Sequence, residues 1–526
     1  MILGKTLRKA LKFFPDKEAI VCGGKRWTYR DFCGRIFRLA SFLEKSGVKK
    51  GDKVALFHPN CHYFLELYYG ISEIGAISVP INYRLSPREI AFILEDSESK
   101  LLFVDPAFRK QIDSVRGEMG QVEKIIWTGE GREPRENGDL GYEEVLTQTT
   151  PQRWGQVEIE PDDVAQLYYT SGTTGRPKGV MLSHKNVYSH ALGTIAELHL
   201  TDQDVWIHVA PLFHLADAWA TWAITWVGGR HVLVREFDSR AVLETIEREK
   251  VTITNLIPTM LNLMVNDPYV GNYDYRSLRA LLSGGAPIAP EVVRKIVETF
   301  RCDYIQTYGM TETSPYLTVS ILKGHLKKLP YEDQLRFKAK TGREFINVEL
   351  KVVNDRGEEV KKDEKEVGEI IVRGDTVTRG YWKLPEETEK SIRNGWLYTG
   401  DMAVIDEEGY VTIVDRKKDM IVTGGENVYS TEVENVLYTH PAILECAVIG
   451  VPDEKWGEAV KAVVVLKPGK EASEEEIIQF CKDRMAHYKA PKSVDFIKAL
   501  PRTGSGKIHK KGLKDKYWQG YEKRVH

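Results

Sequence analysis

The chain has 526 residues, more than a single hydrophobic core usually organises, so we expect at least two domains. Its 74 lysine and arginine residues nearly balance 76 aspartate and glutamate residues, and the formal net charge of -2 excludes an overall electrostatic attraction to nucleic acid or to an anionic membrane. Six cysteines without metal-ligand spacing are typical of reduced, buried thiols and favour a cytoplasmic protein.

The N-terminus predicts a helix packed on its own domain. Its apolar residues recur at helical spacing, at Leu3, Leu7, Leu11 and Phe14. No apolar run there is long enough for a signal peptide. The most apolar later stretch, 219–227, carries threonines and ends at two glycines, so we expect no transmembrane segment.

Helical and strand-like segments alternate between residues 20 and 160. The patterns predict strands at 53–57 and 101–104 and a helix over 64–77. Alternation of this kind favours parallel sheets covered by helices. The predicted fold class is therefore α/β.

Residues 169–179 (Y-T-S-G-T-T-G-R-P-K-G) predict a loop that binds polyphosphate. Glycine, serine and threonine at this density disfavour a helix or a central strand. Backbone N–H groups, hydroxyls and the Lys178 ammonium group all suit phosphate oxygens. The pattern is not a Walker A loop, because Pro177 precedes the lysine and Gly179 follows it. The alternative is a polar surface turn.

Two features follow this loop, and each leaves two interpretations open. His214, in the apolar run 211–215, is either a core histidine or a catalyst. A tryptophan cluster either caps an apolar tunnel or packs as ordinary core, at Trp206, Trp219, Trp222 and Trp226. We expect a helix to begin after Ser183, as its N-cap.

Two blocks place small and polar residues at strand ends. The run 278–287 reads as a strand entering a loop of small residues, where a flat ring could approach the backbone. In the run 304–313, Tyr308 offers an aromatic face, Thr311 a hydroxyl, and Glu312 a carboxylate suited to Mg²⁺.

Charge marks two segments of the C-terminal half. Residues 321–345 are rich in charge, and we expect a solvated excursion there. Five consecutive charged residues at 415–419 separate two apolar segments and predict a linker. We therefore predict an N-terminal domain over 1–415, a hinge at 416–419 and a C-terminal domain over 420–526. Lys507 lies between glycine and an apolar residue, and composition alone favours a solvated lysine there.

Taken together, the blocks resemble those of the adenylate-forming (AMP-binding) enzymes, and in particular the acyl-CoA synthetases. They occur in the family's order, at 169–179, 211–215, 281–287, 308–312, 398–401, 415–427 and 501–508. The resemblance implies a large N-terminal domain of helix-covered sheets and a small, mobile α+β C-terminal domain. It implies a ligase that uses ATP, Mg²⁺ and coenzyme A to convert a carboxylic acid first to acyl-AMP and then to acyl-CoA.

The resemblance also implies roles for individual residues. It assigns catalysis to Lys507, Thr311, Glu312 and His214, with Glu312 also the Mg²⁺ ligand. Lys507 would bridge the carboxylate and the α-phosphate, while His214 would line the acyl pocket. The residues implied to bind ATP or coenzyme A are Thr170, Ser171, Gly172, Thr173, Thr174, Gly175, Lys178, Gly284, Gly285, Ala286, Tyr308, Gly309, Asp401, Arg416, Lys418, Gly424, Gly425 and Glu426.

Within that set, Tyr308 would stack on adenine, and Asp401 and Arg416 would contact the ribose. Lys418 would be the pivot about which the small domain swings, withdrawing Lys507 and presenting the loop 424–426 to the pantetheine arm.

The substrate and some alternatives stay open. Block similarity and the tryptophan-rich region favour a medium- or long-chain fatty acid, with short-chain, thioether or aryl acids as alternatives. Transfer to a carrier-protein pantetheine, a luciferase-like oxygenase and a non-enzymatic nucleotide-binding regulator are the rival functions. A homodimer is one option for the assembly.

Overall fold

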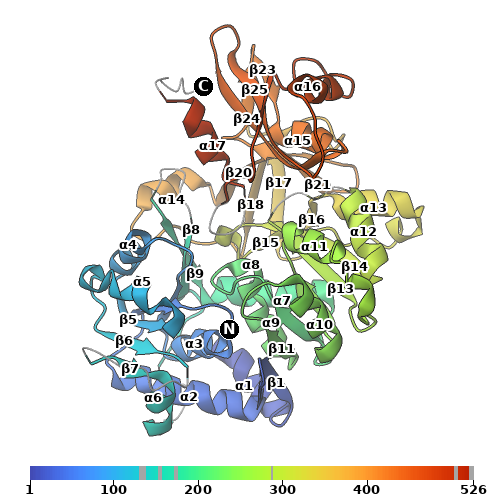
Figure 1. Cartoon of the computed structure of the whole chain (residues 1–526). Helices are drawn as coiled ribbons and strands as arrows, with labels where there is room; N and C mark the ends of the chain where they lie inside the picture. Colours follow the sequence, from blue (N-terminus) through green and yellow to red (C-terminus); the bar gives the residue numbers. More distant parts are fainter. Residues whose placement is uncertain are drawn as a thin grey trace. The chain divides into compact units, whose positions relative to one another are not determined.

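The computed structural model describes residues 1–129, 138–151, 157–170, 176–285, 288, 290–502 and 508–519 (Figure 1). The chain divides into two compact units, Met1–Leu350 with Val372–Leu397, and Lys351–Ile371 with Tyr398–His526. The predicted α/β fold, with a large N-terminal part and a smaller C-terminal part, is confirmed. The predicted hinge at 416–419 falls inside the second unit, and its motion stays a prediction.

The first sheet of the first unit has the strand order β7-β6-β5-β3-β4-β8-β9. Neighbouring strands run parallel, except that β8 and β9 are antiparallel. The strands are β3 (Lys53–Phe57), β4 (Ile77–Pro80), β5 (Ser99–Val104), β6 (Lys124–Trp127), β7 (Leu140–Gly141), β8 (Val164–Thr170) and β9 (Lys178–Ser183).

Both faces of this sheet are covered, as alternation of strand and helix predicts. Ala55 and Phe57 share a core with α4 and α5, while α3 contacts β3 and β4. Successive residues of β3 are therefore buried on opposite faces, which explains its continuous apolar run. The helices of this region are α2 (Tyr29–Lys45), α3 (His62–Glu73), α4 (Pro87–Ser97), α5 (Arg109–Asp113) and α6 (Tyr142–Gln148).

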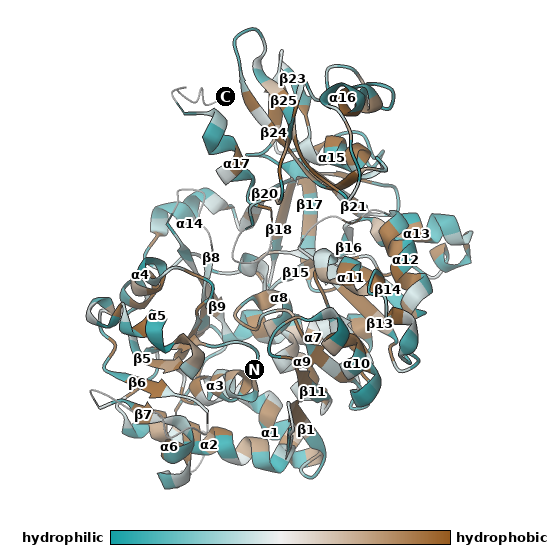
Figure 2. Ribbon diagram, in the orientation of Figure 1, coloured by the Kyte–Doolittle hydropathy of each residue, from teal (hydrophilic) through white to brown (hydrophobic). Residues whose placement is uncertain are grey.

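The second sheet of the first unit runs in the order β16-β15-β14-β13-β12-β10-β11-β1-β2. From β14 to β1 all neighbours are parallel. The strands are β1 (Glu18–Cys22), β2 (Lys25–Thr28), β10 (Val205–His208), β11 (Arg230–Leu233), β12 (Ile253–Asn255), β13 (Ala280–Gly284), β14 (Asp303–Gly309), β15 (Tyr316–Val319) and β16 (Gly342–Glu344). Figure 2 shows β13 and β14 as largely hydrophobic, in contrast to the hydrophilic α14.

Helices pack on this sheet as well, and they include the predicted N-terminal one. α1 contacts α2, α3 and α9, and it buries Leu7 and Ala10 on its own unit, as expected for a helix packed there. Ser183 caps α7 by accepting a hydrogen bond from the Asn186 backbone N–H, also as expected. The helices are α1 (Gly4–Phe13), α7 (His184–Leu198), α8 (Leu215–Ala218), α9 (Ala220–Val227), α10 (Ser239–Glu249), α11 (Pro258–Val265), α12 (Pro290–Phe300), α13 (Tyr331–Ala339) and α14 (Pro385–Ser391), with the short strand β19 (Ile392–Arg393).

The expected solvated excursion at 321–345 is in part ordered secondary structure. It contains α13 and β16, and Leu335 of α13 is 1% exposed in the core that also holds α10, α11 and α12. Charge density misled the prediction because, of the nine residues of α13, only Leu335 is buried.

Two groups of strands lie wholly or partly in the second unit. One has the order β17-β18-β20-β21, and the other β23-β22-β25-β24 with β26 beside β25. α15 and α16 cover the latter, contributing Val433, Leu437, Ile477 and Cys481 to its core. The elements are β17 (Val348–Val353), β18 (Gly368–Gly374), β20 (Trp396–Ile405), β21 (Tyr410–Arg416), β22 (Ile421–Thr423), β23 (Glu426–Val428), α15 (Ser430–Tyr438), β24 (Ile443–Asp453), β25 (Gly457–Leu466), α16 (Glu474–Lys482), β26 (Ser493–Phe496) and α17 (Lys510–Tyr517).

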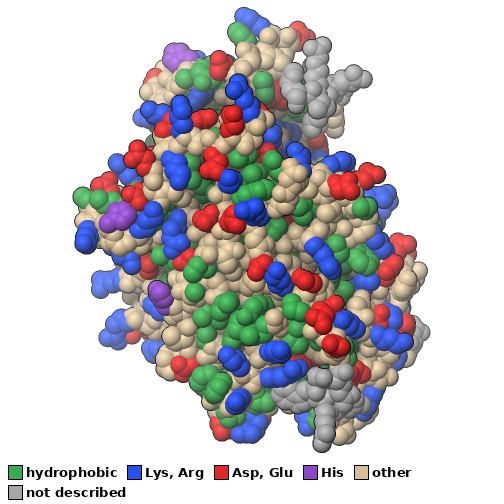
Figure 3. Space-filling model, turned by 180° about the vertical axis from the view of Figure 1, so that it is seen from behind, with side chains coloured by type: hydrophobic (Ala, Val, Ile, Leu, Met, Phe, Trp, Pro, Cys, Tyr) green, Lys and Arg blue, Asp and Glu red, His purple; other side chains and the backbone are tan. Residues whose placement is uncertain are grey.

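The surface and the thiols agree with the composition. Figure 3 shows acidic and basic side chains interspersed over the face turned away from the viewer in Figure 1. All six cysteines lie among the described residues and are free thiols, and five of them are buried. Within the part of the chain that the structure describes, no helix is long and apolar enough to cross a membrane.

Truncating the buried leucine of α13 tests its place in the core. Leu335→Ala should lower the free energy of unfolding by about 2–5 kcal/mol, because it removes buried apolar surface and leaves a cavity. Urea denaturation followed by tryptophan fluorescence measures the change. The matched control is Leu263→Ala on α11, where the leucine is 58% exposed and the change should stay within about 0.5 kcal/mol. Equal losses in the two variants would contradict the core assignment.

Candidate active site

The two ends of the predicted phosphate loop are held together by a strand pair. Thr170 ends β8 and Lys178 begins β9, and the two residues face each other in register. The predicted ligands Ser171, Gly172, Thr173, Thr174 and Gly175 lie outside the described residues. The antiparallel pair therefore fixes where the loop leaves the sheet and where it returns.

Lys178 has an acidic partner on α14. Its ammonium group forms an ion pair with Glu387 and lies 5.4 Å from the centre of the Tyr381 ring. Glu387 is also 3.1 Å from the Lys390 ammonium group, and hydrogen bonding to Lys178 lowers the pKa of this carboxyl group. A polyphosphate that binds Lys178 would have to share or displace this carboxylate.

Glu312 is buried and oriented by a second hydrogen-bonding group. It lies in the 3-10 turn Thr311–Thr313 directly after β14, and it is 7% exposed. The Tyr381 hydroxyl donates to Glu312 Oε1 at 3.0 Å. Burial, and then the charge of Glu312, raise the pKa of Tyr381, so the hydroxyl stays protonated as a donor. Thr311 begins this turn and Tyr308 lies near the end of β14, and both are half-buried.

The predicted nucleotide-binding glycines are needed by the protein's own backbone. A Cβ on Gly309 would lie 1.8 Å from the Pro315 carbonyl oxygen, and one on Gly284 would lie 2.5 Å from Thr307 Oγ1. Gly285 has a φ of +90°, which favours glycine. Ala286 lies outside the described residues. Close strand packing therefore accounts for Gly284 and Gly309 without any ligand.

The loop that carries His214 is held by Asn60, in the loop after β3, and by Tyr68 on α3. The Asn60 amide group donates to the Ala210 carbonyl at 2.9 Å and accepts from the Leu212 N–H at 2.8 Å. The Tyr68 hydroxyl donates to the Leu212 carbonyl at 2.7 Å. His214 itself is half-buried, with its ring 4.6 Å from the Phe213 ring. Asn60 and Tyr68 were missed, because their contacts with Leu212 span 152 and 144 sequence positions and no local pattern marks them.

Three of the four clustered tryptophans are core residues. Trp206, Trp219 and Trp222 are 0% exposed, and the Trp206 indole donates to Asp217 Oδ1 at 3.0 Å. These contacts support the interpretation of ordinary core packing. Trp226 is half-buried and lies 4.9 Å from the Tyr188 ring.

The predicted ribose ligands meet inside the second unit. Asp401 and Arg416 face each other across β20 and β21, and Arg416 Nε lies 3.1 Å from Asp401 Oδ1. Asp401 is buried, while Arg416 and Lys418 are exposed. This pairing brings together two residues that are 15 positions apart in the sequence.

The predicted coenzyme A loop is exposed at Gly424, Gly425 and Glu426. Gly424 and Gly425 have φ values of +61° and +85°. A Cβ on Gly424 would also lie 2.8 Å from the Trp456 ring. Both positions therefore favour glycine for conformational reasons.

Lys507 lies outside the described residues, but the chain on either side is anchored. Arg502 and Ile508 form an isolated antiparallel bridge. Three residues after Lys507, the Lys510 ammonium group lies 2.7 Å from Glu434 and donates to Ser430 Oγ at 2.6 Å. Arg502 and Ile508 are thus held side by side, and Lys510 is fixed to α15.

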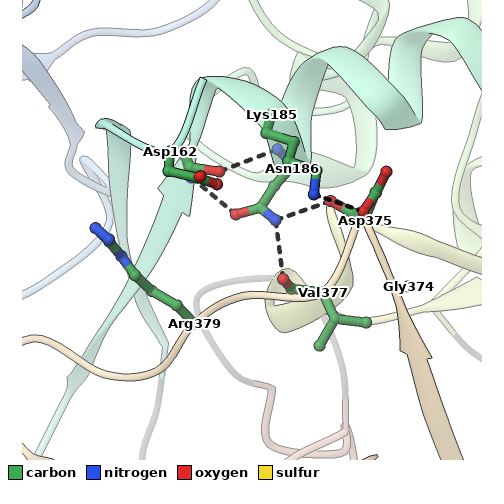
Figure 4. Close-up of a pocket in the computed structure, with 8 residues that line it drawn as sticks. Asp162, Lys185, Asn186, Gly374, Asp375, Val377 and Arg379 are labelled. Carbon is green, nitrogen blue, oxygen red and sulfur yellow. Dashed lines mark hydrogen bonds and ion pairs between the residues drawn. The ribbon is translucent and has the colours of Figure 1, made fainter. Parts of the chain in front are cut away.

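Residues 374–382 are here called the strap. Gly374, Asp375, Val377 and Arg379 of the strap line the pocket drawn in Figure 4. The pocket has a volume of about 160 Å³ and lies between the strap and the start of α7. Asn186 Nδ2 donates to the carbonyls of Asp375 at 2.9 Å and Val377 at 2.8 Å. The pocket is therefore where α7 anchors the strap.

The Glu312 carboxylate is suited to a magnesium ion that is also bound by the phosphates of a nucleotide. Among the described residues, no group of three or more His, Cys, Asp or Glu side chains could hold a metal ion by itself. Mg²⁺ commonly binds through one or two carboxylates together with substrate phosphates. The single buried carboxylate of Glu312 matches that mode.

The comparisons with known proteins agree with this arrangement. The AMP-binding enzyme family matches residues 7–382, and the AMP-binding enzyme C-terminal domain matches residues 432–507. The chain belongs to the AMP-binding enzyme family. The predicted membership of the adenylate-forming enzymes, in the acyl-CoA synthetase branch, is confirmed. The predicted enzyme class, an AMP-forming acid–thiol ligase, is confirmed as well. ATP and coenzyme A as substrates, with Mg²⁺, fit this family.

Its relatives are named for different acids. A 4-hydroxybutyrate–CoA ligase of Metallosphaera sedula is 35% identical, covering 97% of this chain and 93% of the relative. A feruloyl-CoA synthase of an Amycolatopsis species is 36% identical, covering 97% of both chains. A long-chain fatty acid–CoA ligase of Mycobacterium tuberculosis is 36% identical, covering 98% of both.

Solved structures are similar over nearly the whole chain. An anthranilate CoA ligase in complex with anthranoyl-AMP has a TM-score of 0.87 at 29% identity, covering 98% of this chain and 97% of that one. A fatty acyl CoA synthetase of Mycobacterium tuberculosis has a TM-score of 0.76 at 34% identity, covering 98% of both. The similar proteins named above are all ligases, synthases or synthetases, and none is a non-enzymatic regulator, the rival function considered from the sequence.

The role of Gly309 can be tested by stability. Gly309→Ala should lower the free energy of unfolding by about 1–3 kcal/mol, because the added methyl group must push the Pro315 carbonyl aside. Urea denaturation measures the loss. Gly271→Ala is the matched control, since its Cβ would meet nothing within 4 Å. If Gly309 serves only ligand approach, Gly309→Ala would unfold like the wild type and lose ATP affinity alone.

Proposed function

We propose that this enzyme is an ATP-dependent carboxylic acid:CoA ligase whose substrate is a medium- or long-chain fatty acid. The observation that supports this chemistry is that Tyr381 contacts two of the predicted ligands. Its hydroxyl oxygen lies 3.0 Å from Glu312 Oε1, and the centre of its ring lies 5.4 Å from the Lys178 ammonium group. Glu312, proposed to hold the metal, and Lys178, proposed to bind phosphate, therefore both lie next to Tyr381.

In the proposed first step, a carboxylate oxygen of the acid attacks the α-phosphorus of ATP, and the bond to the bridging oxygen of pyrophosphate breaks. Lys178 would hold the β- and γ-phosphates, and Glu312 would hold Mg²⁺, which offsets phosphate charge when bound. Lys507 would stabilise the charge that develops between the two anions. Thr311 would contact the reacting groups.

The remaining assignments place the nucleotide, the acid and the thiol. Tyr308 would stack on adenine, Asp401 and Arg416 would bind the ribose, and His214 would line the acyl pocket. In the second step the thiolate of coenzyme A attacks the acyl carbonyl and AMP leaves. The loop at Gly424 would guide the pantetheine arm after rotation at Lys418.

The choice of acid rests on similarity to the fatty acid–CoA ligase of Mycobacterium tuberculosis, and the names of other relatives keep short-chain and aryl acids as alternatives. A fatty acid–[acyl-carrier-protein] ligase of Streptomyces coeruleorubidus is 32% identical, covering 97% of this chain and 95% of the relative, so a carrier-protein acceptor is the second candidate. The free, mostly buried thiols support the proposed cytoplasmic location. The homodimer stays a prediction.

Exchange of labelled pyrophosphate into ATP tests the acid. Without coenzyme A, we expect exchange with octanoate to palmitate at least tenfold faster than with acetate, 4-hydroxybutyrate or ferulate, since an apolar pocket gains free energy with each buried methylene. Faster exchange with ferulate or 4-hydroxybutyrate would overturn the fatty acid proposal. Thioester formation with coenzyme A, compared with a carrier protein, then identifies the acceptor.

Lys507→Ala tests whether Lys507 acts in adenylation and not in transfer to coenzyme A. Adenylation should fall by about 10²–10³-fold, the usual cost of losing one preorganised charge or donor at a reacting centre. Transfer from preformed acyl-AMP to coenzyme A should change less than about threefold. Measuring the half-reactions separately checks this, and a similar loss in both would contradict the assignment. Lys511→Ala, a nearby exposed lysine, is the matched control.

A further inference from the structure

The strap pairs with the second strand of the phosphate-loop hairpin, β9, around Tyr381. The Met181 N–H donates to the Gly380 carbonyl at 3.1 Å, and the Trp382 N–H donates to the Gly179 carbonyl at 2.7 Å. Between them Val180 and Tyr381 form an antiparallel bridge. The backbone around Tyr381 is therefore fixed relative to Lys178, which begins the same strand β9.

The strap also binds the backbone of the Glu312 turn. The Thr378 N–H donates to the Glu312 carbonyl at 2.7 Å, and the Ser314 hydroxyl donates to the Thr376 carbonyl at 2.8 Å. One short segment thus joins the strand after the phosphate loop to the turn after β14. These two places belong to different sheets of the first unit.

The N-terminal part of the strap is secured separately by α7. The Asn186 amide group holds two strap carbonyls, and Lys185 forms an ion pair with Asp375 at 2.7 Å (Figure 4). The Tyr381 side chain consequently extends from a backbone that is held on three sides, and it is 8% exposed.

A hydrogen bond from such a fixed group restricts a carboxylate. The terminal torsion of a glutamate side chain is broad, so an isolated carboxylate samples many orientations. A donor on one oxygen narrows that range, and groups of this kind around metal ligands typically change metal affinity or activity by about 10–100-fold.

We propose that Tyr381 is a positioning residue that orients the Glu312 carboxylate for the magnesium ion carried by ATP. This inference rests on the proposed function, in which Glu312 is the metal ligand. In this role the hydroxyl acts through Glu312, to which it is hydrogen-bonded. It links metal binding to the strand that begins with the phosphate-binding Lys178.

Tyr381→Phe removes the hydroxyl and keeps the ring. In the presence of ATP and without the acid, Mn²⁺ binding measured by electron paramagnetic resonance should weaken about tenfold. ATP binding without metal, measured by calorimetry in EDTA, should change less than twofold. In pyrophosphate exchange the Mg²⁺ concentration for half-maximal rate should rise about tenfold, while the KM for the acid stays unchanged.

Tyr304→Phe is the matched control. Tyr304 is 0% exposed and its hydroxyl donates to Gln306 on the same strand, away from Glu312, so Mn²⁺ affinity should equal that of the wild type. Thermal denaturation of both variants checks that they are folded. Equal Mn²⁺ affinity in wild type and Tyr381→Phe would overturn the proposal, as would equal weakening in the control.

A double-mutant cycle tests whether Tyr381 acts through Glu312. Tyr381→Phe combined with Glu312→Gln should bind Mn²⁺ no more weakly than Glu312→Gln alone. Additive losses would overturn the positioning role. If none of the acids supports pyrophosphate exchange by the wild type, the proposed function fails. If the wild type exchanges pyrophosphate normally and Tyr381→Phe binds Mn²⁺ as tightly as the wild type, only this inference is contradicted.

Discussion

The carboxyl ends of the parallel strands β12, β13 and β14 share one edge of their sheet, and the arrangement of the first unit depends on this constraint. Gly284 faces Thr307 in register, so the loops that follow β13 and β14 leave the sheet side by side. Ligands of open α/β sheets bind outside such strand ends. The strap then ties this edge to β9 of the other sheet through Thr378 and Trp382.

Polar groups in the interior of the first unit are paired in ways that also position the site. Asp217 is 0% exposed, and its carboxylate contacts the Trp206 indole at 3.0 Å and His208 Nδ1 at 2.8 Å. Asn60 fixes the loop between β10 and His214. Because an unpaired buried polar group costs free energy, these contacts hold α8 and the preceding loop in one arrangement.

A comparable cluster organises the second unit. Ser430 donates its backbone N–H to Asp415, which begins the charged run of the predicted hinge, and its hydroxyl accepts from Lys510. Glu434 completes the cluster by pairing with Lys510. Asp415, which precedes α15 in the sequence, and Lys510, which follows it, therefore both contact the first residue of this helix, Ser430. The start of the charged run and the residues after Lys507 are held at the same place.

The sequence by itself determined the family, the strand–helix alternation and most candidate ligands, because motif chemistry and hydrophobic periodicity are local properties of the chain. Lys178, Glu312 and Ser183 were assigned from neighbours within a few positions. The roles of Tyr381, Asn60 and Leu335 were decided only by the tertiary structure. Tyr381 meets Glu312 across 69 residues and Asn60 meets Leu212 across 152, and no local pattern encodes such contacts. Leu335 was obscured because one buried leucine sets the packing of an otherwise charged helix.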